Sequence, residues 1–269
     1  MHNNTHTKCL ISYDEDHEED LILFSYLMKI DKGFYIDVGA NHPIKGSVTK
    51  LFYDLGWSGI NIEPLPDMYF ALCEDRPRDI NINLGAGSKN EKLSFFVADG
   101  RSTFDLDAKK LAKSSYSNGK DITIDVKPLT DIIMDNIDIN NVDIHFCKID
   151  VENFEKEVLK GIDFNLIRPW VFCIESTVPG TTIPNYDEWE DILFDAGYYF
   201  LCSKDVNRFY GDINKKMFLE ENNNLEDYEI FYPMSKSNNL RWKIGNFILK
   251  PIVYLFNKYN NFKFNKFYK

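Results

Sequence analysis

Acidic and small polar residues follow several apolar runs of strand length in this chain of 269 residues. They are Asp37-Val38-Gly39-Ala40-Asn41, Glu63-Pro64, Gly85-Ala86-Gly87, Asp150-Val151-Glu152 and Glu175-Ser176-Thr177. Carboxylates accept hydrogen bonds and remove protons, and small residues let a ligand approach the main chain. One such group is often only a helix cap or a turn, but a row of them predicts a ligand site.

The first of these turns indicates what kind of ligand it holds. A dinucleotide fold usually carries three glycines here, which seat a pyrophosphate, and this turn has only Gly39. Asp37 lies close to where a phosphate would be, so the turn favours a ligand with an ammonium group and no phosphate. S-adenosylmethionine has these properties and NAD lacks them. We expect Glu63, at a solvent-reachable strand end, to accept hydrogen bonds from two ribose hydroxyls.

Strand-like runs alternate with amphipathic segments of helix length, which favours parallel βαβ units. The predicted fold is α/β, a Rossmann-like doubly wound sheet of seven strands in a single domain. Ligands of such sheets gather at the carboxyl ends of the strands. The predicted strands are Phe34–Val38, Gly59–Ile62, Ile80–Leu84, His145–Ile149, Trp170–Ile174, Tyr198–Cys202 and Asn207–Tyr210.

Three of the helices that we expect between these strands end at a glycine. They are Ser47–Leu55 before Gly56, Phe154–Lys160 before Gly161, and Asp187–Ala196 before Gly197. Leu93–Val97 and Ile122–Val126 are further strand candidates, separated by a polar loop.

Charge is distributed unevenly along the chain. The formal net charge is −11, which argues against a general nucleic-acid binder. Residues 235–269 contain eight Lys or Arg and no Asp or Glu, so 23 basic and 42 acidic side chains remain in the rest. The first 20 residues lack the pattern of a secretory signal, and we expect a cytoplasmic protein. We divide the chain into an N-terminal cap segment (1–32), a catalytic domain (33–212) and a basic, aromatic C-terminal extension (213–269).

Several motifs together resemble the FkbM family of S-adenosylmethionine-dependent methyltransferases. The closest stretches are Phe34–Pro43, Ser47–Lys50, Gly56–Gly59 and Asn61–Pro64. Further matches are Tyr13, Glu19–Leu21, Lys148–Glu152 with Phe154-Glu155, Arg168–Trp170, Glu175 and Pro179–Thr181. The family usually has glycine after the Asp-Val-Glu motif, where this chain has Asn153. Asparagine shares glycine's backbone conformations most readily, so we expect the turn to be retained.

The resemblance implies a class I methyltransferase fold and specific cofactor contacts. Asp37, Gly39, Ala40 and Asn41 would border the methionine part of the cofactor, and Glu63 with Pro64 the ribose. The remaining cofactor-binding candidates are Gly85, the pair Ser102-Thr103 near the adenine, and Tyr13, Glu19 and Asp20, which would close over the methionine end. The run from Asp14 to Asp20 could instead be only a solvated helix start.

Methyl transfer is an in-line displacement, which a carboxylate can assist by removing the acceptor's proton. Asp150 is the first candidate, as base or as ligand of Mg²⁺ or Mn²⁺, with Glu175 and His42 as the other catalytic candidates. Convergence of Asp150, Glu152 and Glu175 would either raise one pKa or require a divalent cation. Glu152 could be only a first-turn helix residue, and His42 only part of a loop. We expect Glu152 and Arg208 to contact the acceptor. Arg208 could equally be a surface charge at the end of a strand.

The resemblance implies O-methylation, with a sugar nucleotide or polysaccharide precursor as the acceptor. Alternatives are a non-sugar secondary metabolite, a nicotinamide-dependent oxidoreductase, or a non-catalytic binding protein on the same fold. Residues 239–250 place apolar and basic side chains at helical spacing, up to Pro251. This segment could dock on the inner face of an anionic membrane, or pack on the acidic body or on a second subunit.

Overall fold

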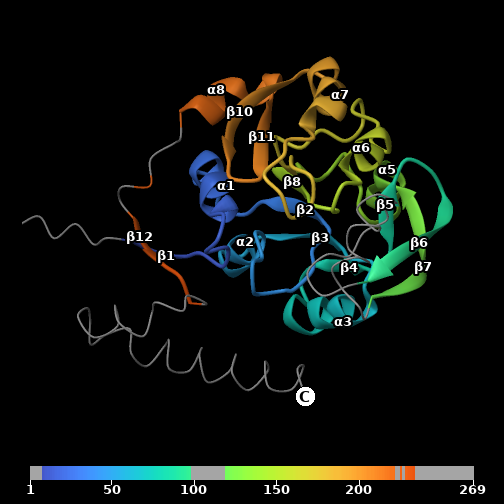
Figure 1. The fold of residues 1–269 in the computed structure, drawn as a ribbon. Helices are drawn as coiled ribbons and strands as arrows, with labels where there is room; N and C mark the ends of the chain where they lie inside the picture. The colour runs from blue at the N-terminus through green and yellow to red at the C-terminus, as the bar shows by residue number, and fades with distance from the viewer. Residues whose placement is uncertain (1–7, 98–118, 222–224, 226–227, 234–269) are drawn as a thin grey trace, which may run out of the picture.

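A sheet of seven strands forms the centre of this computed structural model, which describes residues 8–97, 119–221, 225 and 228–233 (Figure 1). Its strand order is β10-β11-β9-β8-β2-β3-β4. The strands are β2 (Phe34–Val38), β3 (Ser58–Ile62), β4 (Ile80–Ile82), β8 (Phe146–Ile149), β9 (Val171–Glu175), β10 (Tyr198–Lys204) and β11 (Asn207–Asp212). All neighbours pair in parallel except β11, which is antiparallel to both β9 and β10.

The α/β class expected from the sequence is confirmed, and each predicted strand is present with small shifts at its ends. β2 has the bounds predicted for it. The third strand ends at Ile82, two residues early, and the Asn83 side chain donates to the main-chain oxygens of Glu63 and Pro64 at 2.8 and 3.0 Å.

Helices cover both faces of the sheet because its strands alternate between two apolar clusters. Ile36 and Val38 of β2 pack toward α5 (Leu129–Asn136), α6 (Glu155–Lys160) and α7 (Glu190–Asp195). Tyr35 packs on the opposite face, toward α1 (Glu19–Leu27), α2 (Lys50–Asp54) and α8 (Lys216–Glu220). Asp37 alternates with Ile36 and Val38, so its side chain belongs to the α1–α2 face. The remaining described helices are α3 (Pro66–Asp75) and the short 3-10 helices Tyr186–Glu188 and Ile213–Lys215.

The predicted helices begin later than expected. α2 starts at Lys50 and α6 at Glu155. Where one helix was expected from Asp187, the 3-10 helix Tyr186–Glu188 comes first, and α7 begins after Trp189. Gly161 caps α6 with a φ of −82°, whereas Gly56 and Gly197 follow α2 and α7 with φ values of 94° and 82°. Glycine accepts this left-handed conformation without the cost that a Cβ imposes.

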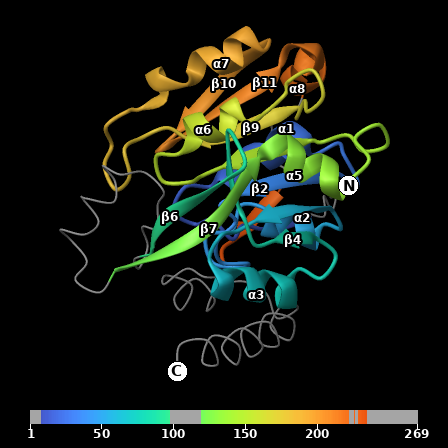
Figure 2. The ribbon, with the colours of Figure 1, turned by 90° about the vertical axis from the view of Figure 1, so that its right-hand side faces the viewer.

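Two smaller sheets accompany the central one. The first contains β6 (Glu91–Val97) and β7 (Lys120–Pro128), which confirm the two additional strands predicted from the sequence. β5 (Gly85–Gly87) completes this sheet by pairing with β7. Figure 2 shows β6 and β7 extending from the body side by side. The second sheet, parallel β1 (Lys8–Ile11) and β12 (Tyr228–Phe231), was not predicted. Within the described part of the chain, no helix is long and apolar enough to cross a membrane. The basic segment 239–250 lies outside that part.

Candidate functional site

The carboxyl ends of β2, β3, β8 and β9 meet at one edge of the sheet. Val38 is paired with both Ile62 and Ile149, and Ile149 is paired with Ile174. The next residue of each strand therefore reaches the same edge, which brings together Gly39, Glu63, Asp150 and Glu175. This row is the candidate site expected from the sequence.

The turn after β2 packs directly on the ends of its neighbours. The main-chain nitrogens of Gly39 and Ala40 donate to the carbonyl oxygen of Ile62 at 2.9 and 3.2 Å. Gly39 has a φ of 80°, and a Cβ there would lie 1.9 Å from the carbonyl oxygen of Asp150. Asn41 continues the turn with a φ of 49°. Glycine is required at position 39 for both its conformation and this close approach.

Glu63 connects the first turn to the second. Its Oε2 accepts a hydrogen bond from the main-chain nitrogen of Asn41 and its Oε1 one from that of Leu65, both at 2.7 Å. The side chain is only 4% exposed, so the expectation of a solvent-reachable strand end is wrong. Burial raises the pKa of Glu63 to about 7. Each carboxylate oxygen still has a second lone pair with which to bind a hydroxyl.

Asp37 precedes the turn at Gly39 by two residues, and one of its two carboxylate oxygens has a hydrogen-bond partner. The Thr49 hydroxyl donates to Oδ2 of Asp37 at 2.8 Å. Oδ1 has no hydrogen-bond partner among the described residues, although Nζ of Lys148 lies 3.8 Å away. A buried acceptor of this kind is suited to a donor from a ligand.

Lys148 is a buried cation whose role the sequence motifs do not predict. Its Nζ donates to Oδ2 of Asp150 at 3.1 Å and to the carbonyl oxygen of Gly39 at 3.5 Å. Burial disfavours its charge, but Asp150, Asp37 and Glu19 outweigh that effect and raise the pKa of the lysine well above its usual value. The sequence does contain a signal for this role, because Lys148 stands within the apolar run of β8 and a buried lysine requires carboxylate partners.

Carboxylates do converge beyond Asp150. Burial, and then Asp150, Glu155 and Glu152, raise the pKa of Glu175 well above its usual value. Oε2 of Glu175 is buried without a hydrogen-bond partner in the described structure. Of the two outcomes expected for such a cluster, the burial of Glu175 among neighbouring carboxylates favours a raised pKa. No group of three or more His, Cys, Asp or Glu in the described ranges could hold a metal ion, so these residues do not fit Mg²⁺ or Mn²⁺.

The turn after Asp150 has the conformation predicted for it. Asn153 has a φ of 77°, as the usual glycine would, and Glu152 has a φ of 54°. The Asn153 side chain accepts from Nδ2 of Asn185 at 2.9 Å. Oε1 of Glu155 accepts from the main-chain nitrogens of Val151 and Asn153, both at 3.2 Å. Burial raises the pKa of Glu155 to about 7. The role of Glu152 in acceptor binding stays a prediction.

In the N-terminal segment, the side chain of Glu19 contacts the sheet, whereas those of Asp20 and Tyr13 fix the position of the segment. Glu19 accepts from Asn207 Nδ2 and contacts the Cys173 thiol, and burial raises its pKa well above the usual value. Asp20 instead accepts from Ser12 Oγ and from the main-chain nitrogens of Tyr13 and Leu21. The Tyr13 hydroxyl donates to Asp54 of α2 at 2.5 Å. Of these three cofactor candidates, Glu19 is therefore the one whose side chain contacts the strands of the central sheet.

His42 and Arg208 are occupied elsewhere. Nδ1 of His42 accepts from the main-chain nitrogens of Ile44 and Lys45 at 3.0 and 3.1 Å, and burial lowers its pKa. The lone pair that a base would use is thus engaged in the loop. Arg208 pairs with Glu190 of α7 at 2.7 Å, on the face opposite Asp37, and its guanidinium lies 3.8 Å from the ring centre of Tyr186.

Two further cofactor candidates follow β3 and β4. Pro64 continues directly from Glu63, and Gly85 is buried in β5, paired with Val126. Ser102 and Thr103 lie outside the described residues.

One comparison with known proteins identifies a relationship. A family model described as the methyltransferase FkbM domain matches residues 37–200, which is more than half of the chain. The matched stretch begins at Asp37 and includes the whole row from Gly39 to Glu175. No curated protein matches the chain. The family resemblance seen in the sequence motifs is confirmed.

Proposed function

The chain belongs to the FkbM methyltransferase domain family, and from this premise we propose that it transfers a methyl group from S-adenosylmethionine to a hydroxyl of a sugar or glycan precursor. The observation that carries the proposal is the row of Gly39, Glu63, Asp150 and Glu175 at the carboxyl edge of the sheet. Ligands of open α/β sheets bind at this edge.

The residues at the first turn fit S-adenosylmethionine better than a dinucleotide. Oδ1 of Asp37 is a buried acceptor suited to the cofactor's ammonium group. Glu63 has lone pairs left for ribose hydroxyls, and Gly39 lets the turn pack against the main chain of Asp150. When bound, the cofactor supplies a methyl group on a positively charged sulfur. The strand order, with antiparallel β11 between β9 and β10, supports a Rossmann-like sheet of the class I methyltransferase type.

Asp150 is the residue that we assign to the acceptor hydroxyl. Its Oδ2 is held by Lys148, which fixes the carboxylate and leaves Oδ1 for the acceptor. Asp150 would take the proton of the acceptor hydroxyl as that oxygen receives the methyl group. Glu175 lies opposite Asp150 on the neighbouring strand, and its carboxyl group, whose pKa is raised by burial, would exchange a hydrogen bond with a second hydroxyl. No step passes through a metal ion.

The alternatives rest on weaker features. The single glycine at the first turn disfavours an oxidoreductase that uses NAD, and a non-sugar acceptor would use the same carboxylates. Carboxylates are hydrogen-bond acceptors only, which suits an acceptor rich in hydroxyl donors and opposes a nucleic-acid backbone. The proposed location is the cytoplasm, where precursors of surface polysaccharides are assembled.

Calorimetric titration with S-adenosylmethionine and with NAD tests the cofactor. We expect saturable binding of the first only, and binding of NAD alone would overturn the proposal. Transfer of labelled methyl groups to nucleotide-activated sugars and polysaccharide fragments then tests the acceptor. A protein that binds the cofactor but methylates only non-sugar hydroxyls would retain the methyltransferase assignment and lose the glycan one.

A further inference from the structure

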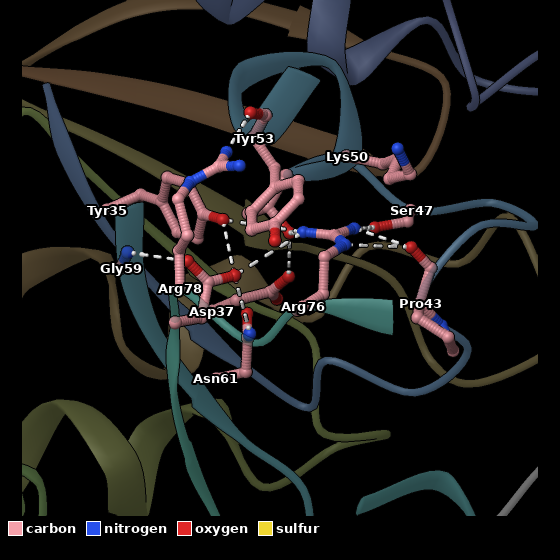
Figure 3. Close-up of polar contacts among 12 residues, drawn as sticks. Tyr35, Asp37, Pro43, Ser47, Lys50, Tyr53, Gly59, Asn61, Arg76 and Arg78 are labelled. Atoms are coloured by element: carbon pink, nitrogen blue, oxygen red, sulfur yellow. Dashed lines mark hydrogen bonds and ion pairs between the residues drawn. The ribbon is translucent and has the colours of Figure 1, made fainter. Parts of the chain in front are cut away.

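Arg76 is a fully buried cation beside the candidate cofactor site, in a part of the chain for which the sequence motifs proposed no role. It follows α3 and is 0% exposed. Nε and Nη2 donate to the carbonyl oxygen of Pro43 at 3.1 and 2.6 Å, and Nη2 also donates to Ser47 Oγ at 2.7 Å (Figure 3). Arg76 thus ties down the loop that follows the Gly39 turn.

The positive charge of Arg76 is balanced within the same network. Its Nη1 lies 3.7 Å from Oδ2 of Asp79 and 3.4 Å from the hydroxyl of Tyr35. Asp79 in turn accepts from the Tyr35 hydroxyl at 2.7 Å and from the main-chain nitrogen of Gly59 at 3.0 Å. The guanidinium is therefore fixed relative to both β2 and β3, the two strands that end at the cofactor turn.

Thr49 connects Arg76 to Asp37 through two hydrogen bonds. Nη1 of Arg76 donates to Thr49 Oγ1 at 3.4 Å, and the Thr49 hydroxyl donates to Oδ2 of Asp37 at 2.8 Å. A hydroxyl has a single proton, so accepting from Arg76 leaves that proton for Asp37. In Figure 3 the side chains of Arg76 and Asp37 lie close together between the loop and the strands.

We propose that Arg76 and Thr49 are positioning residues of the cofactor site, which act by holding one oxygen of Asp37 and leaving the other aimed at the ligand. The inference rests on the proposed function, because it assigns a purpose to Oδ1 of Asp37, which has no hydrogen-bond partner among the described residues and lies 3.8 Å from Nζ of Lys148. The Thr49 hydroxyl is the member of this buried network that is bonded to Asp37 itself, so its removal should release that carboxylate.

Tyr35 provides a matched control. Both Tyr35 and Thr49 are buried, and both hydroxyls lie 3.4 Å from Nη1 of Arg76. Of the two hydroxyls, that of Thr49 donates to Asp37, whereas that of Tyr35 donates to Asp79. Thr49→Val and Tyr35→Phe each remove one hydroxyl with little change of shape. A merely structural network predicts similar effects of both on cofactor binding.

The test is calorimetric titration of the full chain and its variants with S-adenosylmethionine. We expect Thr49→Val to weaken the affinity about tenfold, since a hydrogen bond to a charged group is lost, and Tyr35→Phe and Thr49→Ser to stay within about twofold. Thermal unfolding records the stability of each variant. If Thr49→Val does not fold, Thr49→Ala at lower temperature replaces it.

Equal affinities of the Thr49→Val and Tyr35→Phe variants would overturn the inference while leaving the proposed function intact. Failure of the unmodified chain to bind S-adenosylmethionine would instead refute the proposed function, and the inference with it.

Discussion

A Cβ at position 39 would lie 1.9 Å from the carbonyl oxygen of Asp150, so the cofactor turn and the candidate base are in main-chain contact. We expect Gly39→Ala to unfold at lower urea concentration and to lose S-adenosylmethionine binding. Gly46→Ala is the control, because Gly46 also has a positive φ, 65°, and a Cβ there would meet nothing within 4 Å. The control should cost about 1 to 2 kcal/mol of unfolding free energy. Gly39→Ala should cost about 2 kcal/mol more, since the crowded atom belongs to the main chain. Equal losses would contradict the contact.

Replacing Glu63 should impair both binding and the turn. Glu63→Ala removes the ribose acceptor and leaves the main-chain nitrogens of Asn41 and Leu65 without their partner. We expect the S-adenosylmethionine affinity to fall by about 1.5 to 3 kcal/mol, measured by calorimetry. Asp67→Ala, which removes an exposed carboxylate at the start of α3, should leave the affinity unchanged. An unaltered affinity in Glu63→Ala would exclude the ribose assignment.

Stability of the ligand-free protein should fall as the pH rises from about 4 to 7. Burial raises the pKa of Asp20 from its ordinary 3.8 to about 7, so the folded state holds a proton that the unfolded chain releases. Folding therefore takes up a proton within this range, and the stabilisation is lost as the pH approaches 7. Urea unfolding at several pH values should show a shallower decline in Asp20→Asn. Asp16→Asn, which alters an exposed side chain of the same segment, should keep the slope of the unmodified protein.

Asp150→Asn should reduce turnover far more than cofactor affinity. The amide can still accept from Lys148 through its oxygen, but it cannot take a proton from the acceptor. Single-turnover transfer of labelled methyl groups measures the first effect, and calorimetry the second. We expect chelator treatment to leave the rate unchanged and added Mg²⁺ or Mn²⁺ not to raise it. Full activity of Asp150→Asn would transfer the proposed role to Glu175.

The sequence leaves two kinds of contact open for the basic tail, residues 235–269: an anionic membrane, or the acidic body or a second subunit. We expect a chain that ends at Met234 to bind anionic vesicles less than the full chain does, because the lysines and aromatic residues of the tail suit an anionic surface. Co-sedimentation with vesicles measures the difference. Negligible binding by both chains would exclude the membrane contact, and a smaller oligomer after truncation would favour a subunit contact instead.

The central strands and the ligand edge could be predicted because they depend on local sequence. β2 and β3 are apolar runs that end at a turn, and their polar ends locate Gly39 and Glu63 directly. The predicted turn at Asn153 also depends only on local backbone preference, and its φ of 77° agrees.

Other parts of the site depend on contacts between distant residues, which periodicity does not reveal. Lys148 and Arg76 are buried because carboxylates and carbonyl oxygens from other elements surround them. Arg208 looked available at a strand end but pairs with Glu190, a residue 18 positions away. Such pairings become visible only when the strands are placed side by side.

The pairing of β1 with β12 affects how the protein is made. Ser12 donates to the main-chain oxygen of Phe231, and the Tyr232 hydroxyl donates to Glu18, next to Glu19 at the strand edge. A ribosome synthesises the N-terminal segment first, yet these partners emerge more than two hundred residues later. Contacts so distant in sequence form slowly, because a long loop must close before they contribute. A nascent chain can thus complete its central sheet before β12 emerges, so the N-terminal segment that carries Glu19 would be the last part of the site to be anchored.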